Sequence, residues 1–330
     1  MGISRRRFGQ QIASAVGAVG VGLALPGLLK GAVLQNSRVV LVRSRGLKRL
    51  DHDIGKESAV AALNGALQRI TDAPSAATAW KALFSARERV GIKVSCLPGK
   101  PLSSSWGLVM AIVAGLLDAG LRGENIFVWE RSQRELERAG FRPGRSPEGG
   151  VKIVGTDSLP GGGYSDSIEI SGSVGTCFSR IVEGVDALIN VPVLKDHDIA
   201  GVSIGMKNFF GAIHNPNKFH GNCCDPYVAD LFNHRFIRNK CRLTVCDASR
   251  IQVHNGPAFY PRYAREYGGL LVSTDPVALD FVGWQIIEKQ RGEIGLKSLE
   301  DSGRKPTYIQ TAAGLGLGKA DMKQIKLIEM

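Results

Sequence analysis

Short apolar runs rich in β-branched residues alternate along this chain with longer segments of helical periodicity. Val90–Val94, Asn125–Trp129 and Ala187–Val193 are typical of buried strands, whereas Glu57–Ile70 and Trp106–Ala119 carry apolar residues at helical spacing. Strands that alternate with helices favour a sheet whose strands are mostly parallel. We therefore predict an α/β fold with a mainly parallel sheet flanked by helices.

The remaining segments continue this pattern. Residues 155–175 are rich in Gly, Ser and Asp, which predicts a surface loop or hairpin. Pro192 has no backbone N–H, so we expect a bulge or a strand end there.

Residues 36–330 form one α/β domain, whose length also allows two subdomains. We predict further strands over Val39–Arg43, Val151–Val154, Arg242–Cys246 and Leu270–Ser273, further helices over Gln133–Ala139, Cys177–Val185, Asp225–Phe236 and Val277–Lys289, and short helices with a closing strand over 291–330.

Residues 1–35 differ in composition from the rest. The run Ser4-Arg5-Arg6-Arg7-Phe8 precedes an apolar, Gly- and Ala-rich stretch over Ile12–Leu29. This arrangement resembles a twin-arginine export signal, and a short basic amphipathic or anchor helix is the alternative. No small-x-small cleavage site precedes Lys30, so the segment can remain attached as a membrane tether. We expect the twin-arginine export machinery as a partner. We also expect a periplasmic or extracytoplasmic location, where residues 1–35 can anchor the protein to the membrane.

The charge of the chain favours anionic partners. Of a formal net charge of +12, residues 1–30 contribute +4, so the remaining chain carries +8. An excess of this size suggests an anionic small molecule or an anionic membrane face. No run of Lys and Arg with interleaved aromatic residues follows residue 30, which argues against nucleic-acid binding.

Polar and chargeable residues stand where successive predicted strands end. Ligands of parallel α/β sheets bind beyond the carboxyl ends of the strands. If the sheet is parallel, these ends meet at one edge, and the sequence predicts a single site there. The residues concerned are Ser95-Cys96, Glu130-Arg131, Lys195-Asp196-His197, Asp247 and Thr274-Asp275.

The run Lys195-Asp196-His197-Asp198 combines a cation, carboxylates and an imidazole. A carboxylate of Asp196 or Asp198 beside His197 can orient the ring and raise its basicity, which suits general acid–base catalysis or metal ligation. The alternative is a helix N-terminus with Asp196 or Asp198 as its cap.

Two further lysines are candidate catalytic groups. Lys93 lies inside an apolar strand, where its desolvation is costly unless it is paired. Lys207 follows the flexible segment GVSIGM, and it can hold an anion or act as a covalent amine if its pKa is lowered. An exposed lysine on a small-residue helix is the alternative for Lys207. We assign catalysis to His197, Asp196, Lys93 and Lys207, and substrate binding to Ser95, Arg131, Lys195, Asn208, Asp247 and Asp275.

His214, His220, Cys223 and Cys224 crowd one loop, where nitrogen and sulfur ligands would favour zinc, copper, nickel or iron. Their spacing matches no standard metal motif, and the chain has no C-x-x-C pair. A polar loop whose side chains bond their own backbone is one alternative, and a vicinal Cys223–Cys224 disulfide is another.

Four blocks of the sequence resemble the bacterial and archaeal domain-of-unknown-function 362 family: VGIKV, INVPVLKDHDIAGVSIGMKNFFGAIHNPNKFH, LTVCDASR and LLVSTDPVALDFVGW. The resemblance extends from about Arg38 to the C-terminus. The family has Asn after GIKV, where this chain has Ser95. Some members are fused to iron–sulfur ferredoxin domains, which implies redox or cofactor metabolism. By fold-level analogy, the chain is distantly similar to the lactate racemase family, whose lysine-attached nickel–nucleotide cofactor and histidine bases would correspond to Lys93, Lys207 and His197.

The leading hypothesis is an exported α/β enzyme that binds an anionic small molecule, with a metal or a preloaded, lysine-linked cofactor. In this hypothesis Lys93, Lys207 and Arg131 hold the anion, and His197 is the acid–base group. A ligand-binding or cofactor-handling protein without turnover is the alternative from another class, and a membrane-tethered assembly factor is a third.

Overall fold

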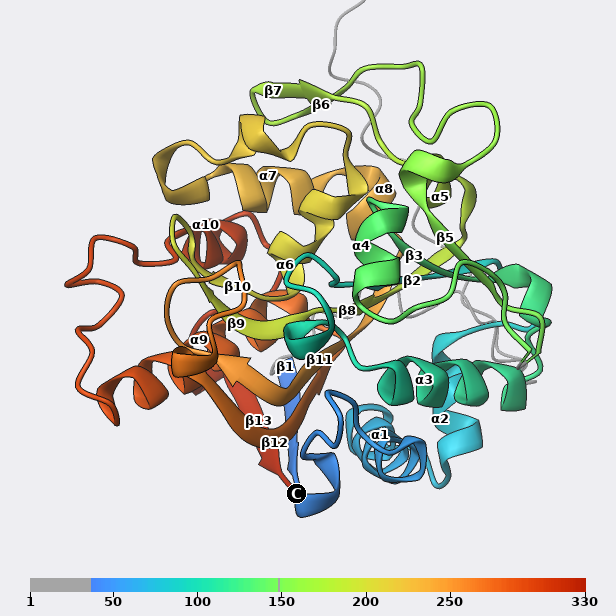
Figure 1. Ribbon diagram of the computed structural model, residues 1–330, viewed down its shortest axis with the longest axis horizontal. Helices are drawn as coiled ribbons and strands as arrows, with labels where there is room; N and C mark the ends of the chain where they lie inside the picture. Colours follow the sequence, from blue (N-terminus) through green and yellow to red (C-terminus); the bar gives the residue numbers. More distant parts are fainter. Residues whose placement is uncertain (1–36, 148) are drawn as a thin grey trace, which may run out of the picture. The chain divides into compact units, whose positions relative to one another are not determined.

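A computed structural model describes residues 37–147 and 149–330 (Figure 1). The predicted signal or anchor over residues 1–35 lies outside these residues. The strands of the main sheet are β1 (Ser37–Arg43), β2 (Val90–Val94), β3 (Ile126–Glu130), β4 (Gly144–Arg145), β5 (Lys152–Gly155), β8 (Ala187–Val191), β9 (Val193–His197), β10 (Gly201–Ser203), β11 (Cys241–Gln252), β12 (Ala264–Ser273) and β13 (Ile325–Glu329).

The sheet is mixed but mainly parallel, as predicted. Its described strands follow the order β13-β1-β12-β11-β8-β2-β3-β5-β4, while β9 pairs with β11 and β10. Strands β11, β8, β2, β3 and β5 are parallel to their neighbours in this series. Strand β12 is antiparallel to both β11 and β1. The carboxyl ends of the parallel strands therefore meet at one edge.

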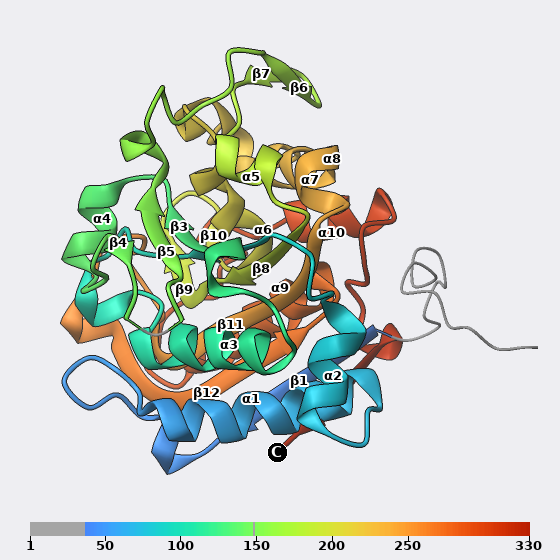
Figure 2. The same cartoon turned by 90° about the vertical axis from the view of Figure 1, so that its right-hand side faces the viewer.

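Helices cover both faces of this sheet (Figure 2). One apolar cluster joins α1–α4 to one face, and a second joins α5–α10 to the other. The helices are α1 (Lys56–Thr71), α2 (Ala76–Leu83), α3 (Trp106–Asp118), α4 (Gln133–Arg138), α5 (Arg180–Gly184), α6 (Gly205–Asn208), α7 (Tyr227–Asn233), α8 (Arg235–Arg238), α9 (Pro276–Gly292) and α10 (Tyr308–Gly314).

Strand periodicity decides which side chains reach each cluster. In β2, Val90, Ile92 and Val94 face α1–α4, so Lys93 points toward the side of α6. In β8, Asn190 shares that side for the same reason. Among the described residues, no helix combines the length and the apolar content needed to cross a membrane.

Several local predictions are confirmed. Residues 155–175 contain most of a small hairpin, β6 (Glu169–Ser171) with β7 (Val174–Thr176). The strand through Ala187 ends at Val191 and resumes after Pro192, because that proline cannot donate to the ladder. The helix predicted over Asp225–Phe236 is two shorter helices, α7 and α8, separated at the extended residue His234.

Helices α2 and α3 pack so closely that Gly115 has no room for a side chain. A Cβ atom there would lie 2.2 Å from the ring of Trp80, which is buried. We expect Gly115→Ala to lower the free energy of unfolding by about 1–3 kcal/mol, because the core cannot absorb the added methyl group. Chemical denaturation would measure this. Gly292→Ala is the control, since nothing lies within 4 Å of a Cβ at that helical position, and an equal loss in both variants would contradict the packing argument.

Candidate functional site

A cavity of about 570 Å³ lies beyond the carboxyl ends of β2 and β3 and beside β9. Its volume is in the range of small-molecule sites. The structure brings many of the predicted site residues together here. Those that line the cavity are Lys93, Ser95, Arg131, Lys195, His197, Lys207, Asn208 and His220. Those that do not line it are Asp196, His214, Cys223, Cys224, Asp247 and Asp275.

Strand β9 separates Asp196 from its neighbours. Alternate residues of a strand point to opposite faces, so Lys195 and His197 face the cavity while Asp196 faces away. The carboxylate of Asp196 lies 3.3 Å from a nitrogen of Arg291 and 3.1 Å from one of Arg304. Burial raises the pKa of Asp196 to about 6, and both guanidinium groups oppose the shift. The assignment of Asp196 to catalysis is therefore replaced by a structural role.

Two backbone amides hold the ring of His197, and Oδ1 of Asp198 lies 3.1 Å from the same ring nitrogen, Nδ1. Its Nδ1 accepts hydrogen bonds from the N–H groups of Ile199 at 3.2 Å and Ala200 at 3.3 Å. A nitrogen that accepts carries no proton, so the proton of the neutral ring resides on Nε2. Burial lowers the pKa of His197, and the nearby ammonium of Lys207 adds to this shift. His197 is thus a neutral hydrogen-bond donor toward the cavity. Asp198 lies beside its ring, as predicted, whereas Asp196 points to the opposite face of β9.

Lys93 is paired, as its burial in a strand requires. Its Nζ lies 2.7 Å from Oε1 of Glu130 and donates to the carbonyl of Val94 at 2.6 Å. Glu130 also accepts from the backbone N–H groups of Cys96 at 3.2 Å and Arg131 at 2.7 Å. The charge of Lys93 is therefore compensated within the protein, and this lysine is poorly suited to hold a ligand anion or to react.

Helix α6 presents Lys207 to the cavity and is tied to the sheet by buried polar groups. Asn190 donates to the carbonyl of Gly205 at 2.7 Å and accepts from Asn208 at 2.7 Å. The carboxylate of Asp280 accepts from the N–H groups of Gly205 at 2.6 Å and Met206 at 3.0 Å. Burial raises the pKa of Asp280 to about 7, and these backbone hydrogen bonds oppose the shift.

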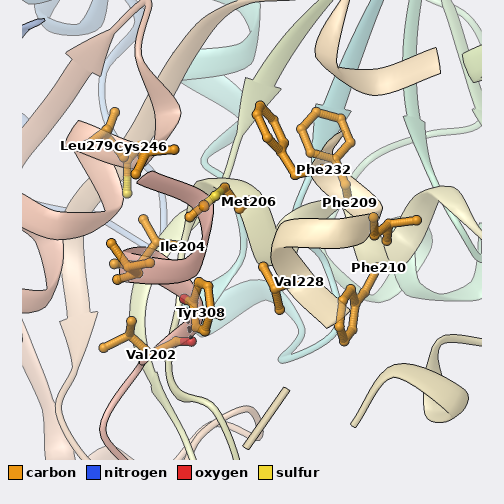
Figure 3. Packing of buried hydrophobic residues seen from close by; sticks show 14 of the residues in the cluster. Val202, Ile204, Met206, Phe209, Phe210, Val228, Phe232, Cys246, Leu279 and Tyr308 are labelled. Carbon is orange, nitrogen blue, oxygen red and sulfur yellow. Dashed lines mark hydrogen bonds between the residues drawn. The ribbon is translucent and has the colours of Figure 1, made fainter. Parts of the chain in front are cut away.

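Apolar packing holds the same helix from its other side. Figure 3 shows Met206 in one cluster with Phe209, Val228, Phe232 and Tyr308. These residues come from α6, the turn that follows it, α7 and α10. A helix of one turn has little stability of its own, so this packing and the polar ties together fix the position of Lys207.

Lys207 contacts a histidine and an aromatic ring. Its Nζ lies 3.1 Å from Nε2 of His220 and 4.0 Å from the ring centroid of Phe210. Nδ1 of His220 lies 3.0 Å from the carbonyl oxygen of Pro216, which can only accept, so Nδ1 carries the proton and Nε2 is free to accept. Burial lowers the pKa of Lys207 to about 8. The ring of His220 stacks on that of His197, with centroids 5.6 Å apart.

Lys195 reaches the same cavity from β9. Its Nζ donates to the hydroxyl of Ser95 at 3.4 Å. Burial lowers the pKa of Lys195 to about 8; the ammonium groups of Lys207 and Lys93 lower it further, whereas Glu130 opposes the shift. Among the residues that the structure describes, neither Lys195 nor Lys207 forms an ion pair with a carboxylate. The cavity therefore holds two lysines without a direct ion-pair partner; Asp198 also lines it and favours the charged form of Lys207 from beyond ion-pair distance.

Asp247 and Asp275, predicted to bind substrate, instead stabilise the fold. Asp247 is fully buried, 3.0 Å from a nitrogen of Arg49, and accepts from Ser105 and Ser249. Burial raises its pKa, but Arg49 and these hydrogen bonds outweigh that effect and lower it. Asp275 caps α9 by accepting from the N–H of Ala278 at 2.9 Å. Both follow strands, but neither reaches the cavity.

The loop residues predicted as metal ligands do not converge. His214 packs edge-on against Tyr164, and the thiol of Cys223 lies 3.7 Å from the carbonyl oxygen of Gly303. Cys224 is buried, and both thiols are free. Within residues 37–147 and 149–330, no group of three or more His, Cys, Asp or Glu side chains could hold a metal ion. The described residues of this loop therefore do not fit a protein-held metal ion.

Sequence reasoning placed Glu130 at the predicted site without a role and missed a second carboxylate of the cavity, Glu135. The role of Glu130 could have been inferred from the burial of Lys93, because a lysine in a central strand needs a carboxylate partner on a neighbouring strand. Glu135 lies 3.3 Å from a nitrogen of Arg131, four residues earlier, and burial raises the pKa of its carboxyl group. Oppositely charged residues four positions apart are common on exposed helices, so only the fold shows that this pair faces a cavity.

The buried Arg49–Asp247 pair yields a stability prediction. We expect Asp247→Asn to lower the free energy of unfolding by about 3–5 kcal/mol, because Arg49 would remain buried without its counter-charge. Asp72→Asn is the control, since the Asp72–Arg38 pair is exposed and contributes little. Denaturation curves for both variants test the contrast, and a comparable loss in each would refute it.

No curated protein matches the chain. Among solved structures, the lactate racemase apoprotein from Thermoanaerobacterium thermosaccharolyticum is similar at 12% sequence identity and a TM-score of 0.44. The likeness covers 76% of this chain and 57% of that one, so the chain spans little more than half of that protein. The family described as Domain of unknown function (DUF362) matches residues 90–285, more than half of the sequence. The chain belongs to the DUF362 family.

Proposed function

We propose that this protein is an enzyme that binds a small organic anion, a carboxylate or a phosphate, in the cavity beside β9. The observation that carries the proposal is that, among the described residues, neither Lys195 nor Lys207 has a carboxylate within ion-pair distance, although both face one cavity. A buried ammonium group is costly unless a charge or strong hydrogen bonds compensate it. A bound anion would supply that compensation.

The walls of the cavity suit such a ligand. Leu97, Ile199 and Phe210 line it beside the two lysines. Apolar walls exclude water and lower the local dielectric constant, which strengthens the attraction between an ammonium group and an anion. His197 adds a neutral donor at Nε2, so the site offers both charged and uncharged hydrogen bonds to ligand oxygens.

Proton transfer is the chemistry that the Lys207–His220 contact supports best. The pKa of Lys207 is lowered by burial to about 8, so a measurable fraction of this amine is neutral near neutral pH. Groups that titrate close to the working pH exchange protons most effectively. Lys195, which contacts only the hydroxyl of Ser95, would act as the counter-charge to the anion.

The two lysines predict how anion binding depends on charge and pH. We expect Lys195→Gln to weaken the binding of small carboxylates at least about tenfold, because a charge-assisted hydrogen bond is lost. In the native protein, affinity should be highest below pH 8 and should fall as the pH rises through about 8, where Lys195 and Lys207 lose their protons. Calorimetric titration across this range measures both effects.

Lys218→Gln is the matched control for charge. It removes a lysine that belongs to the same loop as His220 but does not line the cavity. An equal loss of affinity in both variants would mean that net charge, and not the site, governs binding. Binding without turnover of any carboxylate or phosphate in a substrate panel would support the alternative of a ligand-binding protein without catalysis.

We also propose export by the twin-arginine route, on the basis of Ser4-Arg5-Arg6-Arg7-Phe8 and the apolar stretch that follows. Replacement of both Arg5 and Arg6 by lysine keeps the charge but removes the paired arginines. We expect this double variant to accumulate in the cytoplasm while the native chain is exported. Fractionation of cells that express each form measures the difference, and Arg45→Lys is a control outside the motif. Unchanged localisation of the double variant would contradict the proposal.

A further inference from the structure

We infer that Lys207 forms an imine with the carbonyl carbon of a bound organic acid, which makes 2-oxo acids the substrate class of this site. The inference rests on the proposed binding of an anion in the same cavity. It goes further because it names the reacting atom of the protein and the functional group that the ligand must carry.

The geometry around Lys207 is that of an activated nucleophile. Nζ lies 3.1 Å from Nε2 of His220, and Nδ1 of that ring is held by the carbonyl oxygen of Pro216 at 3.0 Å. A nucleophile, a base within hydrogen-bond reach and a third group that orients the base are the recurring parts of covalent catalysis. The carbonyl of Pro216 fixes the tautomer in which Nε2 can accept a proton from the lysine.

The other lysines of the cavity lack this arrangement. Lys93 is held by Glu130 at 2.7 Å and by the carbonyl of Val94 at 2.6 Å, so its ammonium group is stabilised as a cation. Lys195 donates to the hydroxyl of Ser95 at 3.4 Å, and among the described residues no imidazole or carboxylate lies within hydrogen-bond reach of its Nζ. Lys207 is therefore the amine that can lose its proton to a neighbour, while Lys195 remains as the counter-charge for the carboxylate of the acid.

The surroundings of Lys207 also favour its neutral form. Its side chain is almost fully buried, on a one-turn helix held by Asn190 and Asp280. Burial lowers the pKa of Lys207 and also that of His220, so the imidazole is neutral and can accept a proton. The face of Phe210 lies against Nζ and opposes this effect, because it attracts a positive charge there, both that of the ammonium group and that of the protonated imine.

In the proposed step, the ammonium group of Lys207 gives one proton to Nε2 of His220. The freed lone pair then forms a C–N bond with the carbonyl carbon of the acid. The carbonyl oxygen leaves as water when its C–O bond breaks, and it carries two protons that began on Nζ, one of them relayed by His220. A protonated imine remains, so the positive charge is conserved and no electron donor or acceptor is needed.

Reductive trapping tests this step. The full-length protein is incubated with pyruvate or with 2-oxoglutarate in the presence of sodium cyanoborohydride, which reduces a protonated imine to a stable secondary amine. We expect mass spectrometry of the intact protein to show one adduct, and peptide mapping to place it on Lys207. Lys207→Arg, which keeps the charge but cannot form the imine, should abolish the adduct. Lys218→Arg should leave it unchanged.

A second variant separates the reaction from folding. We expect His220→Asn to slow adduct formation at least about a hundredfold, because the proton acceptor is lost, while Lys207 and the cavity remain. Trapping should speed up as the pH rises toward about 8, since the neutral fraction of Lys207 grows. Unchanged kinetics in His220→Asn would refute the role assigned to the histidine.

Propionate and glutarate, which have the carboxylates but no carbonyl, distinguish the two proposals. If these acids bind and no adduct forms on Lys207 with either 2-oxo acid, the imine is refuted and anion binding stands. An adduct on Lys195 or Lys93 in place of Lys207 would also refute the assignment. If neither propionate nor glutarate binds and no adduct forms, the proposed anion site itself fails.

Discussion

The buried ion pair between Lys93 and Glu130 is the contact on which the site depends. It joins two neighbouring parallel strands at their carboxyl ends, and backbone N–H groups of Cys96 and Arg131 stabilise its carboxylate. A Cβ at Gly211 would lie 2.5 Å from Oε1 of Glu130, so only glycine lets the turn after α6 approach the pair this closely. The pair therefore sets the wall of the cavity as well as its charge balance.

Compensation of Lys93 within the protein leaves a defined excess of positive charge elsewhere. Glu130 pairs with Lys93, whereas the hydrogen-bond partners of Lys195 and Lys207 among the described residues are the neutral groups Ser95 and His220. These two lysines approach from different parts of the chain, one from β9 and the other from the short helix α6. The contrast between a satisfied cation and two unsatisfied ones is the physical basis for expecting an anionic ligand.

Sequence reasoning recovered the architecture and the general position of the site but misplaced several roles. Continuous apolar runs were sufficient to predict the strands around Val90 and Ala187, because burial on both faces of the sheet requires apolar residues at nearly every position. Asp196 was misassigned because adjacency in sequence was taken for adjacency in space, although a strand sends neighbouring residues to opposite faces. Asp247 shows the same limit: a carboxylate at the end of a buried strand can face a ligand or an arginine such as Arg49, and the local sequence is alike in both cases.

By itself, the sequence determined the α/β class, the break at Pro192, the need of Lys93 for a partner, and the cluster of polar strand ends. Each of these follows from interactions within a few residues or from the general cost of burying a charge. Only the tertiary structure decided that Glu130 is that partner, that Lys195 and Lys207 share a cavity, and that His220 lies beside Lys207. These relations join residues far apart in the chain, and they depend on strand order and helix packing, which local patterns do not encode.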